Sequence, residues 1–281
     1  MRKKGILVFI FIWVFCFFLK GEEEKPVILV TNDDGIDSLG IKALAGEMTK
    51  FGKVLVVAPK NNMSGSSHSQ QSKKPTFYSR TDDIPGVDAY WVDNTPVVCV
   101  RWAIAGPLKG QIPDLVISGI NDGPNIGPSY GSGTVGGARE GALAGAVGIA
   151  ASLIDMGEKH DYKGAAVVMR KLAQKALNLK KRPLLWNVNF PYGKIDEKRK
   201  IKVVEITRRW RKMHYIENKN LDGETYFWFK ADRRLWGLEP ESDLAYLLKG
   251  HITVTPHKVY PVNLEAMDKL RALFSEINER N

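Results

Sequence analysis

Cysteine is scarce in this chain, with two among 281 residues, Cys16 and Cys99. Cys16 lies in an apolar run near the N-terminus, so the folded part has one thiol and cannot form an internal disulfide. The chain contains no Cys-x-x-Cys motif, and its five histidines show no metal-ligand spacing. These absences argue against a disulfide-stabilised domain and against a zinc site built from cysteine and histidine.

Long apolar runs are also rare, and the longest, residues 5–19, follows the basic start Met-Arg-Lys-Lys. This run is shorter than the roughly 20 residues that a membrane-spanning helix needs, and it is typical of a signal peptide or short anchor. We therefore predict that residues 1–25 are a leader that exports or anchors the protein, with membrane contact through residues 5–19. The alternative is an overlong start to a cytoplasmic protein, because the fold can begin at Val27.

Neither charge sign is missing, but 41 basic residues outnumber 31 acidic ones and give a net charge of +10. This balance weakly favours an anionic partner such as a phosphate ester, and we predict no stable nucleic-acid partner. The apolar content of 44% is ample for a core, in one large domain or two small ones.

Short apolar runs alternate with helical patterns from residue 27 to about 190. Val27–Val30 and Val54–Ala58 flank a helix with Ser38 as its N-cap, and this βαβ unit predicts a parallel sheet. Further strands are expected at 76–80, 89–92, 114–118, 147–153 and 184–190, and further helices from Thr95-Pro96, at 133–146 and at 161–178.

The pattern changes at about residue 194, where charged and aromatic residues become more frequent. Expected strands at 201–207 and 224–230 favour antiparallel hairpins or a dimerisation arm. The basic run Arg208, Arg209, Arg211 and Lys212 is expected to be a solvated face. We divide the domain, residues 26–281, into a core of about 27–190, a β-rich extension of about 194–260, which holds a last strand at 251–255, and a C-terminal helix of about 263–279.

The first strand ends in Asn32-Asp33-Asp34-Gly35, which puts two adjacent carboxylates where an α/β sheet places its ligands. Such carboxylates repel each other unless a cation lies between them, and a divalent cation is the common solution. The alternative is that Asn, Asp and Gly only form a turn.

Two further oxygen ligands are expected at neighbouring strand ends. Ser64 lies in the polar loop after the second strand, and Asn121 follows the strand at 114–118. With Asp33 and Asp34 they form an all-oxygen set, which Mg²⁺ or Mn²⁺ prefers. This set predicts metal-assisted attack on a phosphate ester.

A glycine-rich segment, Gly131–Gly136, matches the pattern Gly-x-Gly-x-x-Gly. The dinucleotide fingerprint should close the first βα turn, which here is Asn32–Gly35, so an NAD-dependent oxidoreductase is disfavoured. We expect this segment to open a helix whose free N–H groups, with Ser132 and Thr134, form an anion site. The alternative is that its glycines serve backbone geometry alone.

Several linked motifs together resemble the SurE (survival protein E) family of metal-dependent phosphatases, which act on nucleoside monophosphates. They are Thr31–Gly35, Val57–Pro59, Asn62–Ser66, Ser118–Asn121 with Gly123-Pro124-Asn125, and Ser132–Thr134. Asp243 and Thr255-Pro256 also resemble family features. Where the family usually has an aromatic residue before Ser-Gly-Thr, this chain has Gly131, with Tyr130 one position earlier.

The resemblance implies a Rossmann-like α/β domain with a β-rich C-terminal part that forms homodimers or homotetramers. It assigns one divalent ion per subunit, Mg²⁺ or Mn²⁺, to Asp33, Asp34, Ser64 and Asn121. It assigns the substrate phosphate to Ser132, Gly133 and Thr134. The expected reaction is hydrolysis of 5′-nucleotides, and by extension 3′-nucleotides, to nucleoside and phosphate.

Two aspects of this reaction are left open. The expected nucleophile is a water activated by the metal, with direct attack by Asp33 or Asp34 as the alternative. No general acid stands out, and His68 in the Ser64 loop is interpreted as incidental. The competing hypothesis is a protein that binds nucleotides or phosphate without turnover.

Overall fold

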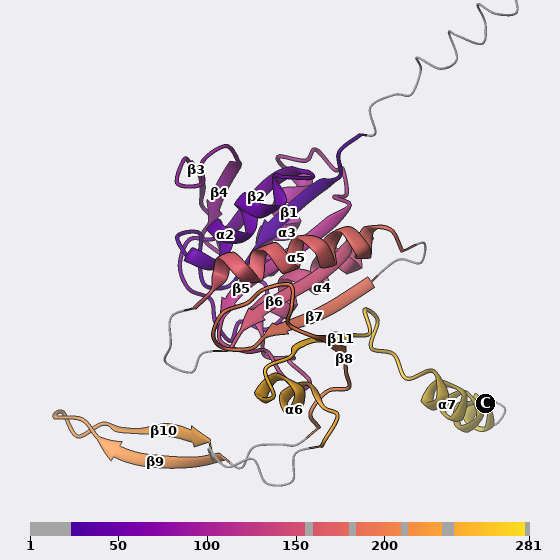
Figure 1. The fold of residues 1–281 in the computed structure, drawn as a ribbon. Helices are drawn as coiled ribbons and strands as arrows, with labels where there is room; N and C mark the ends of the chain where they lie inside the picture. The colour runs from indigo at the N-terminus through magenta and orange to yellow at the C-terminus, as the bar shows by residue number, and fades with distance from the viewer. Residues whose placement is uncertain (1–23, 155–159, 180–183, 209–212, 232–238, 279–281) are drawn as a thin grey trace, which may run out of the picture.

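The computed structural model describes residues 24–154, 160–179, 184–208, 213–231 and 239–278. In these ranges nine strands form one mixed sheet in the order β3-β4-β2-β1-β5-β6-β7-β11-β8 (Figure 1). The bounds are β1 Val27–Thr31, β2 Lys53–Pro59, β3 Tyr78–Thr81, β4 Asp88–Val92, β5 Leu115–Asp122, β6 Val147–Leu153, β7 Leu184–Phe190, β8 Ile201–Val203 and β11 Ile252–Pro256.

The centre of this sheet is parallel, as the βαβ pattern predicts. Strands β4, β2, β1, β5, β6 and β7 pair in parallel, whereas β3 and β11 join their neighbours β4 and β7 in antiparallel orientation. The apolar runs that predicted these strands are buried on both faces of the sheet, which is why they lack polar alternation.

Helices cover both faces of the sheet (Figure 1). α2 (Leu39–Met48) and α5 (Tyr162–Leu177) pack together on one face, and α3 (Pro96–Ala105) and α4 (Gly133–Ala144) pack together on the other. Side chains of a strand alternate between faces, so Val30 joins the α2–α5 cluster while Leu29 joins the α3 cluster. The predicted fold class is therefore confirmed.

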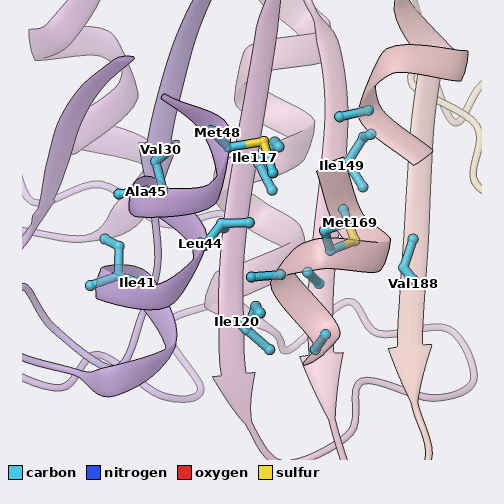
Figure 2. Packing of buried hydrophobic residues seen from close by; sticks show 14 of the residues in the cluster. Val30, Ile41, Leu44, Ala45, Met48, Ile117, Ile120, Ile149, Met169 and Val188 are labelled. Carbon is cyan, nitrogen blue, oxygen red and sulfur yellow. The ribbon is translucent and has the colours of Figure 1, made fainter. Parts of the chain in front are cut away.

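Figure 2 shows the larger core cluster at close range, where α2 supplies Ile41, Leu44, Ala45 and Met48. Helix α2 begins where expected, because the Ser38 side chain accepts a hydrogen bond from the N–H of Ile41. This packing fixes the turn between β1 and α2 against the sheet.

Strand β1 lies at the point where the chain changes direction across the sheet. The chain passes from β1 to β2 on one side and later returns to β5 on the other. In open α/β sheets, ligands bind outside the carboxyl ends of strands at such a switch point. Asp33 and Asp34 follow β1, and Asn121 ends β5, so the fold brings these predicted residues to one edge.

Strand β5 extends further than its apolar run predicts, through Asn121 and Asp122. Its pairing with β6 shifts register between Ser118 and Asn121, and Gly119 there has a φ of 142°. A Cβ on Gly119 would stand 2.3 Å from the main-chain oxygen of Ala151. This irregularity at the strand end redirects the side chains that follow it.

The C-terminal region contains two parts. One includes the short helix α6 (Asp243–Leu248), which the sequence did not predict, packed beside β11, while β8 ends earlier than expected at Val203. The other is a separate antiparallel hairpin of β9 (Met213–Lys219) and β10 (Thr225–Ala231) (Figure 1). Helix α7 (Leu264–Asn278) follows where a C-terminal helix was expected.

Some predictions fall on residues that the structure does not describe. The leader, residues 1–25, lies almost entirely outside the described ranges, and so do Arg209, Arg211 and Lys212 of the basic run. The division of the chain at 26, 190 and 260 stays a prediction.

We expect Gly40→Ala to destabilise the protein by about 2 kcal/mol, because a Cβ at this position would stand 2.0 Å from the main-chain oxygen of Ile120. Gly46→Ala in the same helix is the matched control. It has open space around the new Cβ and should stabilise by up to about 1 kcal/mol. Urea unfolding measures both changes, and equal effects would show that α2 does not approach β5 this closely.

Candidate metal and phosphate site

The turn after β1 is built by Asn32, which leaves both aspartates available. The Asn32 amide nitrogen donates to the Gly35 carbonyl at 2.8 Å and to the Ser38 hydroxyl at 2.8 Å. The Gly35 N–H donates in return to the Asn32 amide oxygen at 3.2 Å. The sequence can therefore form a turn and also offer ligands to a metal, because Asn32 forms the turn and leaves the two aspartates free for a metal.

Asp33 is held by the N-terminus of α4. Its carboxylate accepts a hydrogen bond of 2.6 Å from the Thr134 hydroxyl, and both side chains are buried. A Cβ on Gly133 would stand 2.9 Å from Asp33 Oδ2, so only glycine permits this approach. The Ser132 side chain caps the same helix by accepting from the N–H of Val135, as the expected helix start requires.

A polar network continues behind Thr134. The Asn125 amide nitrogen donates to the Thr134 hydroxyl oxygen at 3.1 Å and to the Ser152 hydroxyl at 2.9 Å. The Asn125 main-chain oxygen accepts from the side-chain amides of Asn187 and Asn189. Asn125 thus joins the loop after β5 to β7 and orients the hydroxyl that holds Asp33.

Asp34 faces the end of β5. Its carboxylate accepts from the Asp122 N–H at 3.1 Å. Next to it, the Asn121 amide nitrogen donates to the Gly123 carbonyl at 2.6 Å, which leaves the Asn121 amide oxygen as an acceptor. The predicted ligands Asp34 and Asn121 therefore come from adjacent strand ends, with the Asp122 carboxylate nearby.

The Ser64 loop approaches Asp33 from β2. The Met63 N–H donates to the Asp33 main-chain oxygen at 2.7 Å, which places the start of this loop against the turn after β1. At its far end the loop is tied to the segment before α4, because the Ser67 hydroxyl donates to the Tyr130 carbonyl at 2.6 Å. Ser64 is exposed.

Several residues of this site were missed by sequence reasoning. Ser66 has a buried hydroxyl without a partner among the described residues, 2.6 Å from a Cβ built on Gly133. His68, interpreted as incidental, pairs with Glu140 of α4 at 2.7 Å, and Glu140 also binds Arg101 at 2.6 Å. The Ser64 loop is thereby fixed to α4 at a second point.

The two aspartates have raised pKa values because of burial and, for Asp34, the negative charge of its neighbour. Burial raises the pKa of Asp33, opposed by hydrogen bonds from the hydroxyl and N–H of Thr134 and the N–H of Gly133. Burial, and then the charge of Asp33, raises the pKa of Asp34 to about 6, and Asp122 adds to the repulsion. A cation placed against these oxygens would relieve both effects.

The residues present fit a hard divalent cation. No ion pair of Asp33 or Asp34 with lysine, arginine or histidine occurs in the part of the chain that the structure describes. Nor do these residues contain a group of three or more His, Cys, Asp or Glu suited to a metal. A metal here would therefore take carboxylate oxygens together with the oxygens of Ser64 and Asn121, a set typical of Mg²⁺ or Mn²⁺.

We expect Asp34→Asn to raise the melting temperature of the metal-free protein by about 3 °C or more near pH 7.5. The stability that protonated Asp34 contributes is complete below its ordinary pKa of 3.8 and is lost as the pH rises through about 6. The difference between the proteins should therefore vanish near pH 4. Thermal unfolding followed by circular dichroism measures this.

Asp37→Asn is the matched control, because Asp37 is exposed in the same turn and its removal changes the same net charge. Near pH 7.5, Mn²⁺ should raise the melting temperatures of the wild type and of Asp37→Asn. It should raise the melting temperature of Asp34→Asn much less. An equal response in all three proteins would place the metal elsewhere.

Comparison with known proteins identifies close relatives over most of the chain. The family model described as Survival protein SurE matches residues 28–215. The 5′-nucleotidase SurE of Vibrio vulnificus is 33% identical, over 93% of this chain and 100% of the relative. That of Campylobacter jejuni is 37% identical, over 87% and 96%. The SurE crystal structure from Aquifex aeolicus has a TM-score of 0.76 and 34% identity, covering 88% of this chain and 99% of that one.

The prediction of export or membrane anchoring is wrong. It depended on one apolar run, residues 5–19, which lies outside the described residues. From residue 24 onward, the described segments include no helix long and apolar enough to cross a membrane. The relatives match nearly their whole length under a name that includes neither export nor anchoring.

Sequence and structure agree on the identity of this chain. The family model matches well over half of it, and the SurE structure from Aquifex aeolicus has the same fold. The chain belongs to the SurE family.

Proposed function

We propose that this protein is a divalent-metal-dependent nucleotidase, which hydrolyses the phosphate monoester of nucleoside monophosphates to nucleoside and phosphate. The observation that carries the proposal is the adjacent pair of buried Asp33 and partly buried Asp34, which forms no ion pair with a basic residue in the described structure, with Asp33 held by the N-terminus of α4. The relatives named 5′-nucleotidase SurE support a phosphoric monoester hydrolase and favour 5′-esters.

Asp33, Asp34, Ser64 and Asn121 would hold one Mg²⁺ or Mn²⁺ ion per chain. When bound, the ion supplies Lewis acidity toward the phosphoryl group and activates a water molecule. Asp33 keeps its orientation through Thr134, so its carboxylate can bind the ion without losing conformational freedom at that step. Asp34 contributes the second charge.

Ser132, Gly133 and Thr134 would hold the substrate phosphate. They open α4, where the helix dipole favours an anion, but the free N–H groups expected there are taken, because those of Gly133 and Thr134 contact Asp33 and that of Val135 donates to Ser132. A Cβ on Gly133 would stand 2.6 Å from the Ser66 hydroxyl and 2.9 Å from Asp33, so glycine at this position lets the start of α4 pack directly against both residues. The Ser66 hydroxyl is an additional donor at this place.

The competing hypotheses find less support. The segment Gly131–Gly136 follows β5 rather than β1, so it does not occupy the place of a dinucleotide fingerprint. A phosphate-binding protein without turnover would have no use for two repelling carboxylates beside its anion site, because they weaken anion binding.

We expect the purified protein to release phosphate from AMP with Mn²⁺ or Mg²⁺ and to stop when EDTA removes the metal. Asp34→Asn should lower the rate by at least about 100-fold, because losing a ligand charge weakens both metal binding and Lewis acidity. Phosphate release measures both. Asp37→Asn should retain wild-type turnover, and near-wild-type turnover by Asp34→Asn would place the site elsewhere.

We also infer that the β9–β10 hairpin is a contact between copies of this chain in a homodimer or homotetramer. Both of its faces expose apolar side chains, with Tyr215, Phe227 and Phe229 on one face and Ile216 and Trp228 on the other. A two-stranded ribbon with exposed aromatic rows is marginally stable alone, and a second copy would cover it.

The double variant Phe227→Asp with Phe229→Asp should shift the protein to the monomer, because it places two charges in the proposed contact. Light scattering after size-exclusion chromatography measures the mass. Phe77→Asp, an exposed aromatic far from the hairpin in sequence, is the control and should leave the mass unchanged. A wild type that is already monomeric would contradict the inference.

A further inference from the structure

A second cavity, of about 560 Å³, lies beside α4 and apart from the acidic pair. Its walls come from the loop before α4, from α4 itself, from the segment after β8, and from the end of β11 with the residues that follow it. None of the seven residues proposed for metal or phosphate lines it. Its volume is in the range of small-molecule sites, roughly 300 to 1,000 Å³.

The wall of this cavity includes a buried arginine without an anionic partner. Arg139 is 9% exposed, and its Nε makes no hydrogen bond. Its guanidinium lies 5.9 Å from the ring centre of Tyr130, and no ion pair of Arg139 occurs among the described residues. Burial lowers the pKa of this guanidinium, which reflects the cost of removing a charge from water.

Two other arginines, the partly buried Arg170 and the exposed Arg101, are each paired with a glutamate. Arg170 binds Glu47 at 2.8 Å, and Arg101 binds Glu140 at 2.6 Å. Glu140 is the next residue after Arg139 on α4, but its carboxylate is taken by Arg101 and His68. Among the described residues, no carboxylate is therefore paired with Arg139, and no ion pair offsets the free-energy cost of burying its charge.

Two further polar atoms in the same wall lack partners. His257 Nε2 and Thr255 Oγ1 are buried, and neither has a hydrogen-bond partner in the described structure. Lys258 also lines the cavity and adds a positive charge. Glu205 lines the cavity too, but its carboxylate is paired at 2.7 Å with Arg208, which is also in the wall. The cavity therefore offers hydrogen-bond donors and positive charge to a ligand that accepts.

We propose that this cavity is a second oxyanion site, which takes the phosphate group of a small molecule between Arg139, His257 and Thr255. A guanidinium, an imidazole and a hydroxyl can each donate a hydrogen bond to a phosphate oxygen. A bound phosphate would therefore give a partner to every unpartnered atom of the wall. Tyr130 and Ile206 provide apolar surface for an organic body attached to the phosphate.

This site is separate from the proposed catalytic one. Arg139 lies six residues after Gly133, which advances about 9 Å along the helix and turns about 240° around it. Gly133 faces Asp33, whereas Arg139 faces the segment after β11. The proposal does not depend on hydrolysis, so failure of the proposed function would leave it standing.

Equilibrium dialysis of the full-length protein with labelled inorganic phosphate and Mn²⁺ tests the proposal. Asp34→Asn should retain a phosphate site, and Arg139→Met in that background should weaken it by at least about tenfold. Thr255→Val, which removes one donor with little change of shape, should weaken it severalfold. Loss of all phosphate binding in Asp34→Asn, or unchanged binding in Arg139→Met, would overturn the proposal.

AMP in the Asp34→Asn background distinguishes the two sources of the phosphate group. Tighter binding of AMP than of inorganic phosphate, lost in Arg139→Met, assigns the site to a phosphate ester. Tighter binding of inorganic phosphate, lost in the same variant, assigns it to the free ion. If Arg139→Met leaves the binding of both probes unchanged, the proposal is contradicted.

Thermal unfolding provides a control for folding. Without phosphate, Arg139→Met should melt at a higher temperature than the wild type, because it removes a buried charge that has no partner. Arg170→Met is the matched control, which should melt at a lower temperature because it leaves Glu47 unpaired. A lower melting temperature for Arg139→Met would show that Arg139 serves the fold instead of a ligand.

Discussion

The repulsion between two adjacent carboxylates, held largely out of water, is the constraint on which the rest of this structure depends. A chain gains nothing for its own stability by placing the partly buried Asp34 beside the buried Asp33. The surrounding elements nevertheless converge on them: α4 holds Asp33 through Thr134, and β5 holds Asp34 through a main-chain N–H. In the proposed metal site, a bound ion would recover the stability given up at this edge.

Glycine at the start of α4 makes this arrangement possible. Gly133 and Gly136 let the helix approach Asp33 and the main chain of Ser67, where a Cβ would meet atoms at 2.9 and 2.3 Å. The glycine-rich segment that first suggested a dinucleotide site therefore serves close packing, as the backbone-geometry alternative predicted. Its role in binding an anion stays a proposal.

The fold could be predicted from local patterns, whereas much of the site could not. Apolar runs, the Ser38 cap and Pro96 at a helix start are local signals, and each element they predicted is present. The pairing of His68 with Glu140 joins residues 72 positions apart, so no local pattern contains it. Arg139 reads as an ordinary charged helix residue beside Glu140, because burial without a partner is a property of tertiary structure alone.

The position of Asn125 has a consequence for how the site assembles. Its main-chain oxygen accepts from two asparagines of β7, a strand more than 60 residues later, and its side chain orients the hydroxyl that holds Asp33. A nascent chain that has completed β1, β5 and α4 therefore contains every proposed ligand but lacks the support that aligns them. Tight binding of the proposed metal would therefore require β7 to have docked against the loop after β5.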